Sequence, residues 1–374
     1  MTAEAATAGH DPALDRRYME LALSLGRRGL GRTWPNPAVG AVVVKDGTIL
    51  GRGWTQPGGR PHAETEALRR AGRAARGATM YVTLEPCSHH GKTPPCAEAI
   101  VKAGIARVVS ALDDPNPEVA GRGYAMLRER GIAVETGLGA DEAAHDHAGH
   151  VRRMREGRPQ VLLKLAVSSD GKAGLAGRKP VGITGEAARI RVHRMRAESD
   201  AILVGIGTIL SDDPHLTCRL PGMLGRSPVR VVLDARLRVP VMTAVIGTAH
   251  ETPTWVVGGR NASAMAEDIL RAKGVEVLRV DERNGRLDIP AVLKALAERG
   301  ITRLMVEGGP TVAASFVQAG LVDEAAVFRA PNPIEGGIGA LEGLPLTALT
   351  QAAWLKPVAT EAVGADTLQT YERA

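Results

Sequence analysis

The sequence predicts an α/β protein of two domains, and three observations support that fold class. The chain has 374 residues, more than a single hydrophobic core usually organises. Short apolar segments rich in β-branched residues alternate along it with segments of helical periodicity, as in layered α/β folds. A charged segment at 152–159, which contains Gly157 and Pro159, separates two such series. We therefore predict one domain over residues 1–157 and a second over residues 158–374.

The first series alternates helices and strands, and turn residues mark several of its boundaries. The apolar run at 39–45 ends at Asp46-Gly47, which is a turn signal. Prolines open the helix expected at 95–103, and Gly104 follows it. We expect helices at 14–28, 62–76, 95–103 and 123–130, and strands at 39–45, 79–84, 105–112 and 132–135. Residues 1–12 are expected to form a mobile tail.

The second series is richer in strands and requires a sheet of its own. We expect strands at 161–167, 201–206, 229–233, 254–257, 275–280, 303–306 and 324–328. The expected helices are 186–197, 288–299 and 310–319. No internal repeat relates this series to the first.

Composition and charge narrow the class of ligand. Aromatic residues make up only 3% of the chain, so it offers little material for the stacking platforms of nucleic-acid grooves. The formal net charge is +6, and the excess of basic residues is shared evenly between the two halves. Small phosphorylated ligands explain this charge as well as a polymer would. We expect small-molecule substrates and no nucleic-acid partner.

Cysteine content and hydropathy point to the reducing cytoplasm. The three cysteines, Cys87, Cys96 and Cys218, are a poor basis for a disulfide framework, and Cys218 is expected to be an ordinary free thiol. The first residues lack the basic and apolar regions of a secretory signal. The longest apolar stretch, at 201–210, is too short to span a bilayer. We expect a soluble cytoplasmic protein with no membrane partner; a homo-oligomer is compatible with the sequence.

Four residues in one order indicate a catalytic zinc site. His62, Cys87 and Cys96 are zinc ligands by type, and three ligands leave the fourth tetrahedral position open. Glu64 lies two residues after the histidine and can carry protons for an activated water. The order His-x-Glu, Pro-Cys and Cys is typical of zinc deaminases that act on nucleobase-like rings.

Two other interpretations of these residues stay open at this point. Each cysteine alone would more often be a buried apolar residue. A structural zinc is a second alternative, with His89 or His90 as the fourth ligand. The complete set, in order and with Pro86 and Glu64 in place, favours a catalytic zinc. Cys96 also lies at the start of a predicted helix, where the helix dipole favours a thiolate over a thiol.

The segment 83–96, TLEPCSHHGKTPPC, closely resembles the bifunctional deaminase/reductase family of riboflavin biosynthesis. Its spacing of eight residues between the cysteines departs from the Cys-x-x-Cys of cytidine and tRNA-editing deaminases. Further segments that resemble the family are 35–40, 61–64, 113–117, 163–165, 169–171, 200–205, 212–217 and 306–311. The resemblance therefore covers nearly the whole chain.

The resemblance implies a fold and a reaction for each domain. The N-terminal domain should have a cytidine-deaminase-like three-layer α/β/α fold with one Zn²⁺. It should deaminate 2,5-diamino-6-(5-phosphoribosylamino)pyrimidin-4(3H)-one to 5-amino-6-(5-phosphoribosylamino)uracil. The C-terminal domain should have a dihydrofolate-reductase-like α/β fold and use NADPH to reduce the ribosyl arm to a ribityl arm.

The resemblance also assigns roles to single residues. Those expected to contact substrate are Asn36 and Lys92 in the deaminase, and Arg196, Leu216, Arg219 and Glu307 in the reductase. Lys164 is a further polar candidate of the reductase site. Those expected on the cofactor side are Ala166, Thr208, Asp212, Gly309, Pro310, Thr311, Val312, Ala313, Ala314 and Ser315. The glycine turn that opens the helix at 310–319 suits a dinucleotide phosphate, because free backbone amides face it.

Four positions depart from the family's pattern. Thr55 stands where the family usually has histidine, and Ala235 replaces a frequent serine. Pro180 and Gly182 stand where serine and tryptophan are common. These changes affect individual contacts and leave the domain assignments intact.

Two functions from other classes compete with the bifunctional enzyme. A nucleic-acid-editing deaminase with an accessory domain would need an RNA groove, which the scarcity of aromatic residues and the even charge disfavour. A non-catalytic binding protein derived from an enzyme would be expected to lack Glu64 or a zinc ligand, and none is missing.

Overall fold

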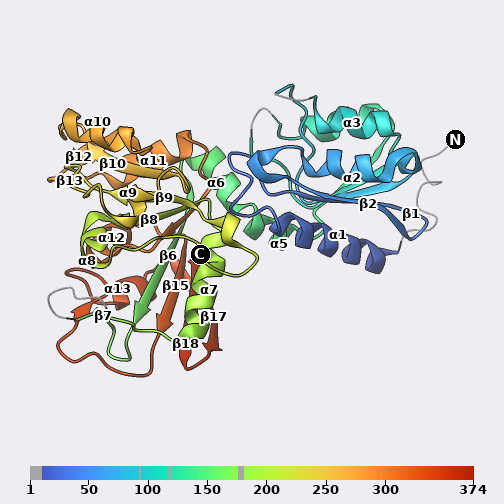
Figure 1. The fold of residues 1–374 in the computed structure, drawn as a ribbon. Helices are drawn as coiled ribbons and strands as arrows, with labels where there is room; N and C mark the ends of the chain where they lie inside the picture. Colours follow the sequence, from blue (N-terminus) through green and yellow to red (C-terminus); the bar gives the residue numbers. More distant parts are fainter. Residues whose placement is uncertain (1–10, 92–93, 117–118, 176–180) are drawn as a thin grey trace. The chain divides into compact units, whose positions relative to one another are not determined.

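The computed structural model describes residues 11–91, 94–116, 119–175 and 181–374 (Figure 1). The chain divides into two compact units, Met1–Glu156 and Gly157–Ala374. Residues 1–10 of the expected tail lie outside the described part. Asp11 and Pro12 do not belong to a tail: Asp11 caps helix α1 (Pro12–Arg27) by accepting the Ala13 N–H, and Pro12 is its first residue.

The first unit is built on a five-stranded sheet. Its strand order is β2 (Thr48–Trp54), β1 (Gly40–Lys45), β3 (Thr79–Val82), β4 (Arg107–Ser110) and β5 (Ala133–Thr136). Strand β1 is antiparallel to both neighbours, and β3, β4 and β5 run parallel. Strand β2 was not predicted, because its glycines hide the strand pattern. They serve close packing: a Cβ on Gly51 or Gly53 would lie 2.1 or 2.2 Å from a carbonyl oxygen of helix α2.

Helices cover both faces of this sheet. On one face, α2 (Ala63–Ala71), α3 (Cys96–Ala103) and α4 (Arg122–Glu129) pack through residues such as Ala67, Ile100 and Leu127. On the other, α1 and α5 (Ala140–Asp146) pack through Met19 and Ala143. Figure 1 shows these layers, which confirm the predicted α/β/α arrangement. The unit ends in α6 (Ala148–Glu156). Residues 152–156 of the charged segment that was expected to separate the two series are therefore helical.

The second unit contains a nine-stranded sheet. Its order is β11 (Glu276–Val280), β10 (Thr254–Gly259), β9 (Val229–Leu233), β8 (Ala201–Gly205), β14 (Arg303–Val306), β6 (Gln160–Val167), β15 (Glu324–Arg329), β18 (Asp366–Arg373) and β17 (Leu355–Val363). The first seven strands are parallel, and β18 and β17 are antiparallel additions. All seven predicted strands are present. The β17–β18 hairpin was missed, because β17 is mostly exposed and has no apolar alternation.

Smaller elements complete the second unit. Two short ladders pair β12 (Glu282–Arg283) with β13 (Arg286–Leu287), and β16 (Ile338–Gly339) with β7 (Lys172–Gly174). The helices are α7 (Glu186–Ala197), α8 (Ile206–Asp212), α9 (Ala244–Gly247), α10 (Ala264–Ala272), α11 (Ile289–Glu298), α12 (Pro310–Gln318) and α13 (Thr347–Thr350). Helix α7 packs Ala188 and Val192 against Phe328 and Leu368 of the sheet.

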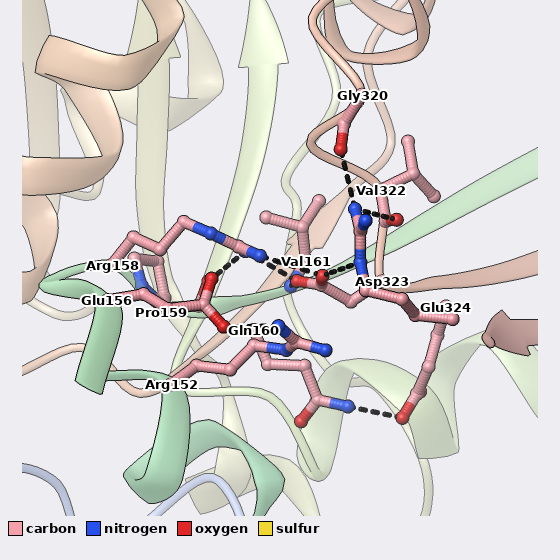
Figure 2. A network of polar contacts seen from close by, with 11 residues as sticks. Arg152, Glu156, Arg158, Pro159, Gln160, Val161, Gly320, Val322, Asp323 and Glu324 are labelled. Carbon is pink, nitrogen blue, oxygen red and sulfur yellow. Dashed lines mark hydrogen bonds and ion pairs between the residues drawn. The ribbon is translucent and has the colours of Figure 1, made fainter. Parts of the chain in front are cut away.

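A buried carboxylate ties the first strand of this unit to its last (Figure 2). Asp323 accepts two hydrogen bonds from the Arg158 guanidinium, at 2.6 and 2.9 Å, and one from Arg373 Nε at 2.8 Å. It also accepts the Val161 N–H at 2.9 Å. Four donors thus compensate one buried charge at the ends of β6, β15 and β18.

Among the described residues, no helix combines the length and the apolar character that crossing a bilayer requires.

Candidate active sites

The three predicted zinc ligands converge in the first unit. His62 immediately precedes α2, Cys96 is the first residue of α3, and Cys87 lies five residues beyond the end of β3. One donor atom from each lies within 4.8 Å of the other two. His62 Nδ1 is 3.3 Å from Cys96 Sγ and 3.7 Å from Cys87 Sγ. A tetrahedral zinc with ordinary bond lengths separates nitrogen and sulfur donors by about 3.6 Å, so the set fits this metal.

The two sulfurs differ in their affinity for a proton. Hydrogen bonding from Cys96 lowers the pKa of Cys87 to about 4, against the opposing effect of burial. The Cys96 N–H also donates to Cys87 Sγ at 3.3 Å. The pKa of Cys96 is raised, because its thiol donates to Cys87 and is buried. A metal that takes both sulfurs as thiolates therefore displaces a proton from Cys96.

Glu64 and Asn36 flank this cluster. Glu64 lies in the first turn of α2 and is buried, and burial raises the pKa of its carboxyl while His62 lowers it. A raised carboxyl pKa suits a group that must take and return a proton near neutral pH. Asn36 Nδ2 donates to the Gly59 carbonyl at 2.8 Å and is 3.3 Å from His62 Nε2. Lys92 lies outside the described residues.

His89 and His90 do not join the cluster. Both are exposed, and His90 Nε2 contacts Glu98 at 2.9 Å. Within the described part of the chain, the group of metal-binding side chains consists of His62, Cys87 and Cys96. The geometry therefore favours an open fourth position over the fully ligated structural site.

The second unit contains a cavity of about 1050 Å³ at the carboxyl ends of β8 and β9 and at the start of α12. This edge of an open α/β sheet is where ligands bind. Predicted cofactor and substrate residues that line it are Thr208, Asp212, Arg219, Gly309, Pro310, Thr311, Val312 and Ser315. Ala313 and Ala314 are buried on the core side of α12, so they support the helix without lining the cavity.

Three charged residues meet where β6 and β14 lie side by side. The Arg196 guanidinium donates to both carboxylate oxygens of Glu307, at 2.6 and 2.9 Å, and to the Thr217 carbonyl at 3.1 Å. Although burial acts in the opposite direction, Arg196 and Lys164 hold the pKa of Glu307 below its ordinary value. Burial lowers the pKa of Lys164. The Arg196 guanidinium is thus paired with the Glu307 carboxylate, whereas the Arg219 side chain is exposed.

Comparisons with known proteins agree with both sites. Residues 12–112 match the cytidine and deoxycytidylate deaminase zinc-binding region, and residues 159–368 match the RibD C-terminal domain. The riboflavin biosynthesis protein RibD of Bacillus amyloliquefaciens is 45% identical, over 92% of this chain and 94% of its own length. The Escherichia coli protein of that name is 42% identical, over 94% and 97%. This chain belongs to the RibD family.

Solved RibD structures share the whole fold. The Acinetobacter baumannii RibD superimposes with a TM-score of 0.85 at 36% identity, over 97% of this chain and 99% of that one. A Thermotoga maritima deaminase/reductase gives 0.84 at 34% identity, with the same coverage. The predicted family and two-domain α/β fold are confirmed. The chain is a bifunctional deaminase and reductase of riboflavin biosynthesis, and the RNA-editing alternative is not favoured.

The departures from the RibD pattern have different structural settings. Thr55 is buried, and its Oγ1 accepts the Val39 N–H at 3.1 Å, so it belongs to the scaffold. Gly182 and Ala235 both line the reductase cavity. Pro180 lies outside the described residues. Of the remaining predicted positions, Leu216 is buried with a positive φ of 55°, and Ala166 is half-buried in β6.

Glu85 has a structural role that the sequence did not predict. Its buried carboxylate accepts the N–H groups of Asp114, Gly121 and Gly123, at 3.3, 3.0 and 2.9 Å. A Cβ on Gly123 would lie 2.1 Å from the Pro86 carbonyl oxygen, so the start of α4 packs directly against Pro86, the residue that precedes Cys87. A carboxylate at the end of an apolar strand was the available signal.

We expect Glu85→Gln to lower the free energy of unfolding of the deaminase domain by about 1–3 kcal/mol, because the new amide donor faces buried N–H groups. Hydrogen exchange of the Asp114, Gly121 and Gly123 amides in the full chain measures the change. Glu98→Gln is the control, since Glu98 is exposed and its ion pair is with the exposed ring of His90. Equal protection of these amides in both variants would show that Glu85 does not hold them.

Proposed function

We propose that the N-terminal domain hydrolyses the 2-amino group of 2,5-diamino-6-(5-phosphoribosylamino)pyrimidin-4(3H)-one and that the C-terminal domain reduces the ribosyl arm of the product with NADPH. The carrying observation is the convergence of His62, Cys87 and Cys96 beside the buried Glu64, in a chain with a separate dinucleotide-sized cavity. The Thermotoga maritima relative bears the names of these two activities, diaminohydroxyphosphoribosylaminopyrimidine deaminase and 5-amino-6-(5-phosphoribosylamino)uracil reductase.

In the deaminase, we assign the proton transfers to Glu64. A zinc ion held by His62, Cys87 and Cys96 supplies Lewis-acid activation of water. Glu64 accepts a proton from the attacking water and delivers it to the amino group, so that the carbon–nitrogen bond breaks and ammonia leaves. We assign the orientation of the pyrimidine to Asn36, whose Nδ2 is 3.3 Å from His62 Nε2. Lys92 is proposed to hold the phosphoribosyl arm.

In the reductase, NADPH supplies the hydride that reduces the sugar carbon of the opened ribosyl arm. The backbone N–H groups at the start of α12 are those of Gly309, Thr311 and Val312, since Pro310 has none, and they are suited to a phosphate of the dinucleotide. The lowered pKa of Lys164 makes it a stronger acid than an ordinary lysine, which suits protonation of the arm as it opens. Arg196 is assigned to position Glu307, and Arg219 to the substrate phosphate.

A coupled assay tests both steps together. The full chain, loaded with zinc, is given the diaminopyrimidinone substrate and NADPH, and ammonia and NADPH are followed in the same sample. We expect one ammonia released for each NADPH oxidised, with ammonia appearing first. Ammonia without NADPH oxidation would contradict the reductase assignment. NADPH oxidation with the uracil intermediate, but no ammonia from the diaminopyrimidinone, would contradict the deaminase assignment.

The cellular setting follows from the same chemistry. All three cysteines are free thiols, and two of them are proposed zinc ligands that oxidation would destroy. A supply of NADPH is also required. Both needs support the reducing cytoplasm as the place of function.

A further inference from the structure

We propose that Arg238 and Arg286 form a clamp for the 2′-phosphate of NADPH, so that the reductase domain selects NADPH over NADH. The inference rests on the proposed reductase function and assigns its cofactor specificity to two residues. Both side chains line the 1050 Å³ cavity. Arg238 follows strand β9, and Arg286 begins strand β13.

Arg238 lies at the β9 end of the cavity, and the β12–β13 ladder that carries Arg286 lies beside the carboxyl end of the neighbouring strand β10, where Glu282 faces Gly259. The sheet order here is β9, β8, β14 and β6, and the cavity lining includes residues of β9 and β8 and the start of α12, which follows β14. Helix α12 follows β14 and marks the position of the pyrophosphate, while Lys164 on β6 and Glu307 after β14 mark the reacting end. The adenosine half of the cofactor must therefore extend past β8 toward β9, where Leu233 and Ala235 also line the cavity.

Both guanidinium groups keep donors for a ligand. Arg238 Nε is 3.6 Å from Asp234 Oδ1, and Arg286 Nη2 is 3.7 Å from Glu342 Oε2, and both distances exceed those of hydrogen bonds. The two side chains are 59% and 63% exposed. An arginine in this state can turn its planar fork toward a phosphate and donate two hydrogen bonds.

The carboxylate at this end of the cavity does not serve a ribose hydroxyl. Sites that select NADH use an acidic side chain to bind the ribose 2′-hydroxyl, and such a charge would repel a 2′-phosphate. Asp234, at the end of β9, is fully buried, and its Oδ2 accepts the Val239 N–H at 2.8 Å. Its other oxygen, Oδ1, lies 3.6 Å from Arg238 Nε, so its charge acts on Arg238 and not on a ligand. Among the described lining residues, Asp212 is the only carboxylate, and it belongs to α8 beside Ser211.

A second pair of arginines accounts for the other phosphate. Arg189 lies on α7, and the Arg219 backbone N–H donates to His193 Nδ1 of the same helix at 3.4 Å. Helix α7 packs on β14, β15 and β18, which lie on the other side of β8 from β9. One cavity thus presents two arginine pairs, in agreement with one phosphate on the substrate and one on the adenosine of the cofactor.

Binding measurements on the full chain test the clamp without turnover. Dissociation constants for NADPH, NADH and adenosine 2′,5′-bisphosphate are measured by calorimetry for wild type, Arg238→Gln, Arg286→Gln and the double variant. We expect each single change to weaken NADPH and the bisphosphate about tenfold, and the double change about a hundredfold, while NADH stays within about twofold. Arg236→Gln and Arg283→Gln are matched controls, since both are exposed neighbours outside the lining.

Each other outcome has a distinct meaning. Equal weakening of NADPH and NADH would refute the clamp and assign the arginines to the shape of the cavity. Unchanged binding in the double variant would refute it as well. If wild type binds NADPH and NADH equally, the clamp is wrong and the reductase function stands. If wild type binds neither dinucleotide, both the clamp and the proposed reductase function are wrong. The preference of wild type should also decrease as salt rises, because the added interaction is ionic.

Discussion

Glu64→Gln is expected to reduce ammonia release by at least about a thousandfold, the largest effect of any single change in the deaminase domain. The substitution preserves the size of the side chain but removes its ability to accept a proton, and general acid–base catalysis contributes on this scale. Glu64 is buried in the first turn of α2 beside Cys96, so no bulk water replaces it easily. Ammonia release is measured with the diaminopyrimidinone substrate.

Two controls separate proton transfer from damage to the site. Zinc content by elemental analysis should stay at one ion per chain, because Glu64 is not among the three clustered donors. NADPH oxidation with the uracil intermediate should also be unchanged. Glu66→Gln makes the same substitution on the same helix, where Glu66 pairs with Arg69 and Arg70, and should keep ammonia release near the wild-type rate. Normal ammonia release by Glu64→Gln would remove Glu64 from the mechanism.

The cluster of His62, Cys87 and Cys96 was predictable because its residues belong to short sequence segments with a characteristic pattern. His62 and Glu64 share one helical turn, and Cys87 and Cys96 stand at a strand end and a helix start, so each local environment follows from a few neighbouring residues. Strands β8 and β9 were equally predictable from the sequence. All five residues of each are buried, and apart from Gly205 and Arg230 they are apolar.

Features that depend on distant partners were not predictable in the same way. The charge on Glu307 is meaningful only beside Arg196, which lies 111 residues earlier in the chain. The same holds for Asp323 and Arg158, separated by 165 residues, and for the loop that Glu85 holds. Two of the strands that were not predicted, β2 and β17, owe their place to close backbone packing or to an edge position, and neither leaves an apolar pattern.

The proposed arginine clamp also depends on residues that are distant in the sequence. No 2′-phosphate site is identifiable in the sequence, because Arg238 and Arg286 belong to separate segments and resemble ordinary surface charges. The fold brings both segments to one cavity. Asp234, near Arg238, directly follows strand β9, and from the sequence alone it could be assigned as a ribose-binding acid. Its complete burial in the structure excludes that role.

Glu307→Gln is expected to have the largest effect in the reductase domain. The change leaves Arg196 and Lys164 without their shared anion in a buried setting, and removal of one partner of such a pair costs about 3 kcal/mol of unfolding free energy. Hydrogen exchange of β6 and β14 in the full chain measures the loss. Glu361→Gln is the control: its ion pair with Arg191 is exposed at both ends, so its removal should cost under about 1 kcal/mol.

The pH dependence of stability distinguishes the loss of the Glu307 charge from a change in packing. The pKa of Glu307 in the folded protein is below its ordinary value of 4.5, so its stabilising contribution is complete above pH 4.5 and is lost as the pH falls through the lower, folded value. The stability difference between wild type and Glu307→Gln should therefore be constant near neutral pH and shrink below pH 4.5. A difference that persists unchanged in acid would assign the effect to packing. In the proposed mechanism Lys164 acts beside Glu307, so NADPH oxidation should be lost in this variant while ammonia release continues.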